Sequence, residues 1–124
     1  MLLLRFVTTI LFFGFQTFAF TASSPLLCLA ENLDLYANAL SGTIPSFMSK
    51  LGSLRELDVH DNNFVGTMPK AICEQKLDVL VSDCYGKNKE VKCDCCQICC
   101  EGLPHMRCVD MRTNQEIIIG MQTK

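Results

Sequence analysis

The chain has 124 residues and a formal net charge of −2. This length suits one domain, and so small a charge argues against a nucleic-acid partner or an acidic lipid surface. Nine cysteines are many for a chain of this size. Such a density predicts an oxidising compartment and a disulfide scaffold.

Residues 1–23 have the pattern of a secretory signal peptide. Arg5 precedes an apolar run at residues 6–15, and small or polar residues end the segment. The run is shorter than the roughly 20 residues that span a bilayer, so we favour cleavage, after Ala19 or after Ser23, over an uncleaved anchor. No later segment predicts a membrane span. We therefore expect a secreted protein, or one held outside the cell at its surface.

One segment of the sequence occurs twice. Residues 33–45 read LDLYANALSGTIP and residues 57–69 read LDVHDNNFVGTMP, so residue 57 repeats residue 33 at an offset of 24 without a gap. A fixed period in this range predicts a stacked repeat architecture.

Each part of the repeated unit has a structural role. Alternating apolar residues predict a short strand with one buried face, and the asparagine bonds the backbone of the turn that follows. The glycine permits a tight bend, and the proline sets a rigid outer segment. One strand cannot bury its apolar face alone, so the units must stack. The structural positions are Leu33, Leu35, Asn38, Gly42, Pro45, Leu57, Val59, Asn62, Gly66 and Pro69.

A third strand is expected within residues 77–84. Leu80 follows Leu57 after 23 residues instead of 24, and no Asn-x-Leu-x-Gly pattern comes after it. The array therefore has fewer than three full units, whereas stacked repeats need about three for stability. A truncated remnant of a longer repeat protein remains an alternative interpretation.

These positions resemble the leucine-rich repeat in its plant-type extracellular form, with the consensus LxxLxxLxLxxNxLxGxIPxxLGx. The resemblance covers about residues 27–84. It implies an α/β repeat solenoid, with parallel strands on the concave face and an irregular or 3-10 helical convex side. The expected organisation is a signal peptide at 1–23, repeats at 24–84, a cysteine-rich C-terminal cap at 85–108 and a tail at 109–124.

The cysteine-rich segment directly follows the last expected strand. We interpret it as a disulfide-stapled cap, because the open end of a repeat stack must be shielded. Leucine-rich-repeat proteins of algae have a similar C-x-C-C-x-x-C-C run after their final strand. The disulfide candidates are Cys73, Cys84, Cys93, Cys95, Cys96, Cys99, Cys100 and Cys108.

Two other interpretations of the cysteines stay open. The dense group at residues 93–100 has the ligand type of a thiolate metal cluster, and Cys96 and Cys99 form a C-x-x-C motif typical of redox dithiols. An odd cysteine, Cys28 or Cys108, would leave a thiol for a link between chains and hence for a homo- or hetero-oligomer.

The resemblance places ligand binding on the outward strand positions. Apart from the cysteine group, we find no signature of an active site, a phosphate loop, a metal site or a cofactor site, so we expect a non-enzymatic protein that binds an extracellular protein or glycan. The alternative is a cysteine-rich metal-binding or structural secreted protein. The candidate binding residues are Asn32, Asp34, Tyr36, Glu56, Asp58, His60, Asp61, Val79 and Val81, and Asp83 is the next outward position in the third strand.

Overall fold

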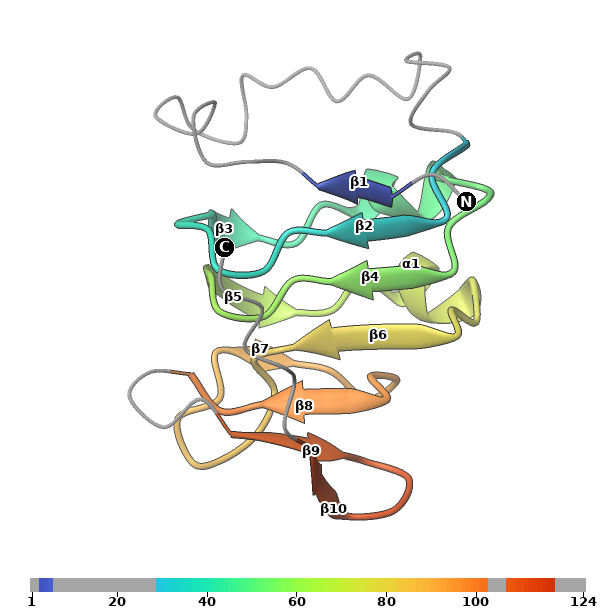
Figure 1. Ribbon diagram of the computed structural model, residues 1–124. Helices are drawn as coiled ribbons and strands as arrows, with labels where there is room; N and C mark the ends of the chain where they lie inside the picture. Colours follow the sequence, from blue (N-terminus) through green and yellow to red (C-terminus); the bar gives the residue numbers. More distant parts are fainter. Residues whose placement is uncertain (1–2, 6–28, 103–106, 118–124) are drawn as a thin grey trace.

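A seven-stranded sheet runs the length of the molecule (Figure 1). The computed structural model describes residues 3–5, 29–102 and 107–117. The sheet is parallel as far as β8, after which β9 and β10 are added antiparallel. In spatial order its strands are β1 (Leu3–Arg5), β2 (Asn32–Asp34), β4 (Glu56–Asp58), β6 (Val79–Ser82), β8 (Ile98–Cys100), β9 (Cys108–Asp110) and β10 (Gln115–Ile117).

The strands of this sheet pair in the register of the sequence repeat. Leu33 lies opposite Leu57, and Leu57 lies opposite Leu80. The third strand, expected within residues 77–84, is therefore present as β6. It keeps the register although one residue of the repeat length is missing.

A second, three-stranded parallel sheet was not predicted from the sequence. β3 and β5 follow the asparagine turns and β7 follows the turn at Asp83, so each of the three units contributes one strand to each sheet (Figure 1). Gly42 has φ +85° and Gly66 has φ +92°, which is the backbone bend expected of these glycines. In spatial order the strands are β3 (Ser41–Thr43), β5 (Asn63–Thr67) and β7 (Val91–Lys92).

Short helices follow the two repeat prolines. Pro45 precedes a 3-10 helix at Ser46–Lys50, and Pro69 precedes α1 at Lys70–Glu74. Proline suits these positions because its fixed φ starts a helix and its missing N–H would have no partner there. In the described residues, no helix has the length and apolar character needed to cross a bilayer.

The hydrophobic core lies between the larger sheet and the side that carries the helices and the second sheet. The first two units send to it apolar residues from the strand of the larger sheet, from the segment around the glycine bend and from the helix, which is why the apolar positions of the repeat recur. The largest fully buried apolar side chains are Phe64, Leu33, Met48, Leu51, Leu57, Ile72, Leu80, Val59 and Val91.

The C-terminal region continues both sheets instead of forming a separate unit. β8 pairs with β6 and β7 pairs with β5, so pairing crosses the expected boundary at residue 84. β9 crosses the expected boundary at residue 108, and β10 belongs to the segment that was expected to be a tail. Of the expected signal peptide, the structure describes only β1, and both cleavage positions lie outside the described residues.

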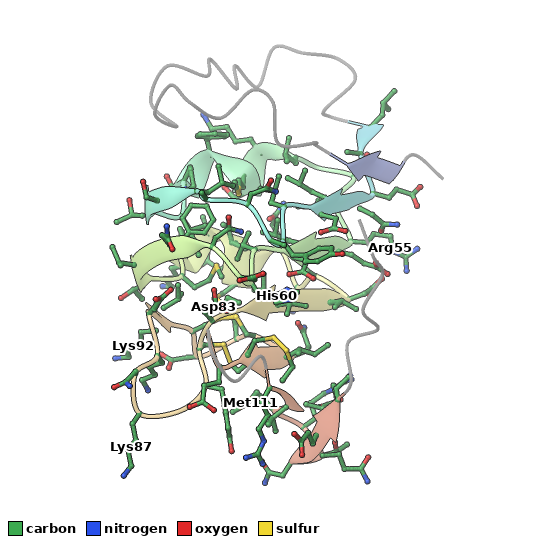
Figure 2. All side chains as sticks on the ribbon, turned by 60° about the vertical axis from the view of Figure 1, so that its left-hand side comes forward. Arg55, His60, Asp83, Lys87, Lys92 and Met111 are labelled. Atoms are coloured by element: carbon green, nitrogen blue, oxygen red, sulfur yellow. A yellow bond between two sulfur atoms is a disulfide. The ribbon has the colours of Figure 1, made fainter. Side chains whose placement is uncertain are left out.

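Four disulfides join the eight candidate cysteines (Figure 2). This pairing is at odds with the redox motif, because Cys96 and Cys99 belong to different disulfides. It is also at odds with Cys108 as the odd cysteine, and Cys28 lies outside the described residues. The pairs are Cys73–Cys95, Cys84–Cys99, Cys93–Cys96 and Cys100–Cys108.

Candidate binding face on the larger sheet

The larger sheet has one face toward the core and one face away from it, which we name the outward face. Strand alternation puts Leu33 and Leu57 in the core and their neighbours on the outward face. The register aligns Asn32 with Glu56 and Val79, and Asp34 with Asp58 and Val81. The outward residues of three units thus form rows across the strands.

Buried side-chain acceptors connect the turns of successive units. Asn62 Oδ1 accepts a hydrogen bond from the backbone N–H of Leu40 at 3.1 Å. Asp83 Oδ1 accepts from the N–H of Asp61 at 3.1 Å, and Oδ2 accepts from the N–H of Asn62 at 3.4 Å. We name this series the turn ladder: a side-chain acceptor in one unit bonds turn N–H groups of the unit before it.

The family model for the Leucine Rich Repeat matches residues 53–74. This stretch contains β4, the Asn62 turn, β5 and α1, which together make one complete unit of the stack. The chain contains a leucine-rich repeat. Comparison with curated proteins and with solved structures gives no match.

Three of the candidate binding residues are buried, contrary to expectation. Asn32, His60 and Val81 expose 9%, 5% and 3% of their surface. Val81 packs in a small apolar cluster with Cys100 and Cys108 on the outward side of the sheet. The C-terminal region therefore covers the Val81 end of β6, whereas Val79 stays partly exposed, as do Asp34, Tyr36 and Asp58 in the first two units.

Two stacked rings follow β2 and β4 on this face, one partly exposed and one buried. The rings of Tyr36 and His60 have centroids 5.2 Å apart and an interplanar angle of 5°. His60 Nδ1 donates a hydrogen bond to Asp58 Oδ1. The same oxygen accepts from the backbone N–H of His60, and Asp34 Oδ1 accepts from the N–H of Tyr36 in the same way, each at 3.1 Å. In both units an aspartate thus accepts the backbone N–H two residues later, and in the second unit Asp58 also holds the ring of His60.

Opposing effects act on the protonation of His60. Burial lowers the pKa of His60, but its hydrogen bond to Asp58 and the charges of Asp58, Asp83 and Asp61 outweigh burial, so the net shift is upward. For Asp83, burial raises the pKa of the carboxyl more than the N–H bonds from Asp61 and Asn62 lower it. Figure 2 labels His60 and Asp83, which lie close together beside the disulfide-linked cap.

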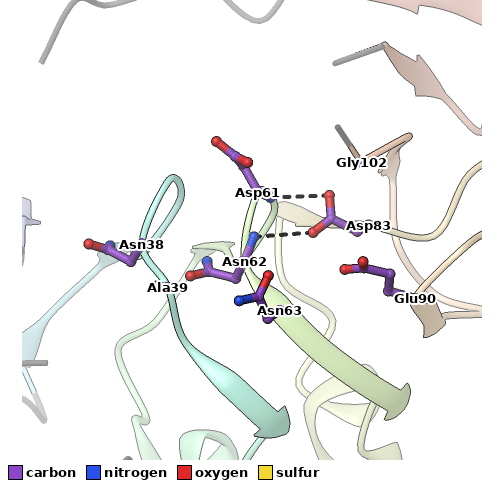
Figure 3. Close-up of a pocket in the computed structure, with 8 residues that line it drawn as sticks. All are labelled: Asn38, Ala39, Asp61, Asn62, Asn63, Asp83, Glu90 and Gly102. Carbon is purple, nitrogen blue, oxygen red and sulfur yellow. Dashed lines mark hydrogen bonds between the residues drawn. The ribbon is translucent and has the colours of Figure 1, made fainter. Parts of the chain in front are cut away.

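A shallow pocket of about 210 Å³ lies along the turn ladder (Figure 3). Its acidic lining comes from Asp61, Asp83 and Glu90. Asp61 was a candidate binding residue and is partly exposed here, whereas Asp83 is 3% exposed and was wrongly expected on the accessible face. The ladder role of Asp83 was missed, because it follows Asn62 by 21 residues and not by 24.

Two groups of side chains have the spacing of metal ligands. His60 lies with Cys100 and Cys108, and Cys84 lies with Cys93 and Cys96. In each group the cysteine sulfurs are already joined in disulfides, and the same holds for all five cysteines at residues 93–100. Cysteine binds a metal as the thiolate, and a disulfide offers no thiolate. In the disulfide-bonded form, these cysteines therefore cannot form the thiolate metal cluster that the sequence left open.

Proposed function

We propose that this chain is a non-catalytic, extracellular protein with plant-type leucine-rich repeats, and that its outward face binds a protein or glycan partner. A role in adhesion, in receptor-like recognition or in the inhibition of an extracellular enzyme fits this proposal. The observation that carries it is the stacked pair of Tyr36 and His60, held on the outward face by Asp58.

The physical argument is one of preorganisation. Binding energy at protein interfaces concentrates in a few aromatic and well-packed anchors, and a side chain that is already fixed loses little entropy on binding. Tyr36 is held against His60, and His60 is held by Asp58. Because His60 is almost fully buried, its role is to stack against the tyrosine ring, and it is poorly placed to meet a reactant.

The charge of the surrounding residues favours a partner with positive groups. Asp34, Asp58 and Glu56 occupy outward positions of β2 and β4. The cation nearest in sequence, Arg55, is engaged by Asp78 at 2.6 Å. A cationic or hydrogen-bonding segment that lies across the two strands would meet an aromatic surface flanked by carboxylates.

An array of purified extracellular proteins and glycans tests the proposal. We expect a saturable ligand for the full chain, and we expect Tyr36→Ala to lose at least tenfold in affinity. Val65→Ala is the matched control, because Val65 lies on β5 and is 53% exposed. Ligands that bind the wild type and Tyr36→Ala equally would contradict the outward face as the site.

Mass spectrometry of the chain expressed in a eukaryotic secretory host tests the extracellular assignment. We expect protein in the medium, with an N-terminus at Phe20 or Ser24 and with the eight candidate cysteines paired. Retention inside the cell with an intact N-terminus would contradict secretion. Free thiolates with bound zinc or copper would instead favour the metal-binding alternative.

A further inference from the structure

Among the described residues, the turn ladder ends at Asn38. The Nδ2 group of Asn38 donates to the carbonyls of Leu35 at 2.9 Å and Tyr36 at 3.3 Å, as Asn62 does in its own turn. Its Oδ1, however, is buried and has no hydrogen-bond partner among the described residues. Asn38 as a whole is 8% exposed, so this acceptor is shielded from water as well as unpaired.

The next unit shows what Asn38 Oδ1 is positioned to accept. The equivalent oxygen of Asn62 accepts the backbone N–H of Leu40, which belongs to the unit before it. By the same repeat, the donor for Asn38 would be a turn N–H of a unit stacked before β2. A buried acceptor without a donor costs about 1–3 kcal/mol, so supplying that donor stabilises the assembled state.

Both sheets offer an edge at the same end of the stack. β3 is the edge strand of the smaller sheet, and its residues Ser41, Gly42 and Thr43 are exposed. In the larger sheet, β1 pairs in parallel with β2, with Leu4 opposite Leu33 (Figure 1). The pairing of β1 shows that the β2 edge accepts a parallel strand from a distant segment. β1 covers only three residues and is paired with neither β3 nor the Asn38 turn in the described structure.

We propose that this end of the molecule docks one leucine-rich-repeat unit of a partner protein. The partner places a strand beside β2, in the position that β1 occupies in the uncleaved chain. It also places a turn N–H on Asn38 Oδ1 and a second short strand beside β3. The occupant is a unit of the same repeat, because such a unit carries a strand for the β2 edge, a turn N–H for Asn38 Oδ1 and a second strand for the β3 edge. In the Asn62 unit these three contacts are made together by the unit that precedes it. This docking surface is separate from the outward face and does not depend on its ligand.

A synthetic peptide of residues 29–47 is the direct probe. In the intact stack this sequence precedes the Asn62 unit and donates the Leu40 N–H to it. We expect the fluorescent peptide to bind the full chain saturably, as measured by anisotropy. Binding should shift the side-chain amide signal of Asn38 in the nuclear magnetic resonance spectrum of the protein.

Methylation of the peptide backbone supplies matched controls without altering the protein. A methyl group on the Leu40 nitrogen removes the proposed donor and should weaken binding at least tenfold. The same group on the nitrogen of Ser46, beyond the strand and turn that dock, should change affinity less than twofold. Equal affinity of the unmodified and Leu40-methylated peptides, or the absence of saturable binding, would overturn the proposal. The full chain could also associate with itself in sedimentation experiments, and the peptide could abolish that association. This result would overturn the proposal of a partner protein and identify a second copy of the chain as the occupant.

Discussion

Asn62 joins two repeat units through one buried side chain. Its Nδ2 lies within hydrogen-bonding distance of the carbonyls of Leu35, Val59 and His60, and its Oδ1 accepts from the N–H of Leu40. Buried backbone groups need partners, and turns between sheets leave several of them without strand pairing. The asparagine recurs in the sequence because it meets this need within its own turn and in the turn before it.

We predict that Asn62→Ala lowers the free energy of unfolding by about 2–4 kcal/mol, since it leaves several buried groups without partners. Asn63→Ala is the matched control, because Asn63 is the exposed neighbour and its substitution should cost less than about 0.5 kcal/mol. Urea denaturation followed by circular dichroism measures both variants. A loss of similar size in the two would show that the ladder contributes little to stability.

His60 predicts a pH dependence of folding. Because the folded protein raises the pKa of His60, its stabilising contribution is complete below the unfolded value of about 6.5 and declines as the pH rises through the folded value. Stability should therefore fall as the pH rises above about 6.5. In His60→Gln, urea melts over this range should show a smaller decline. An identical pH profile in the variant would assign the decline to other groups.

The residue roles that could be predicted are those that repeat. Asn38 and Asn62 were identifiable as turn residues because they recur at a constant offset. The ladder role of Asp83 was hidden by the shorter spacing of the last unit. The burial of His60 was also unpredictable, since it depends on the ring of Tyr36 and on the position of the cap, which are set by tertiary packing.

At the scale of elements, the strands of the larger sheet can be predicted from the sequence pattern, and those of the smaller sheet cannot. β2 and β4 have an apolar residue between polar ones, and this alternation predicts strands. β3 consists of Ser41, Gly42 and Thr43, all exposed, and so has no apolar pattern from which a strand could be predicted. The second sheet forms because the bends at the repeat glycines align these short segments, which is a consequence of stacking and not of local propensity.

The bend at Gly66 gives a prediction at this scale. Its φ of +92° is unfavourable for residues with a side chain, although an added Cβ would meet only Thr43 Cγ2 at an ordinary 3.5 Å. We expect Gly66→Ala to destabilise the protein by about 1–2 kcal/mol through backbone strain. Gly52 is the matched control, because it has open space and does not have a positive φ. Thermal unfolding of both variants distinguishes strain from a general loss of stability on glycine replacement.

At the scale of the whole molecule, the two ends of the stack are completed differently. At the C-terminal end, β8 extends the parallel sheet, and the antiparallel strands β9 and β10 end it. Disulfides attach this end to the repeats, through Cys73–Cys95 from α1 and Cys84–Cys99 from the segment after β6. The sequence predicted a stapled cap, but pairing cannot be read from cysteine spacing, so the continuation of both sheets into the cap could not be foreseen.

The span of each disulfide predicts how much it stabilises this assembly. Cys73–Cys95 closes a loop of 22 residues between a repeat and the cap, whereas Cys93–Cys96 closes one of 3 residues within the cap. The chain-entropy relation then gives about 3 kcal/mol for the first and about 1.5 kcal/mol for the second. We expect the double variant Cys73→Ala/Cys95→Ala to lose roughly twice as much unfolding free energy as Cys93→Ala/Cys96→Ala. Both variants remove one disulfide and differ in the length of the loop that it closes, so equal losses in urea denaturation would contradict a stabilisation set by loop length.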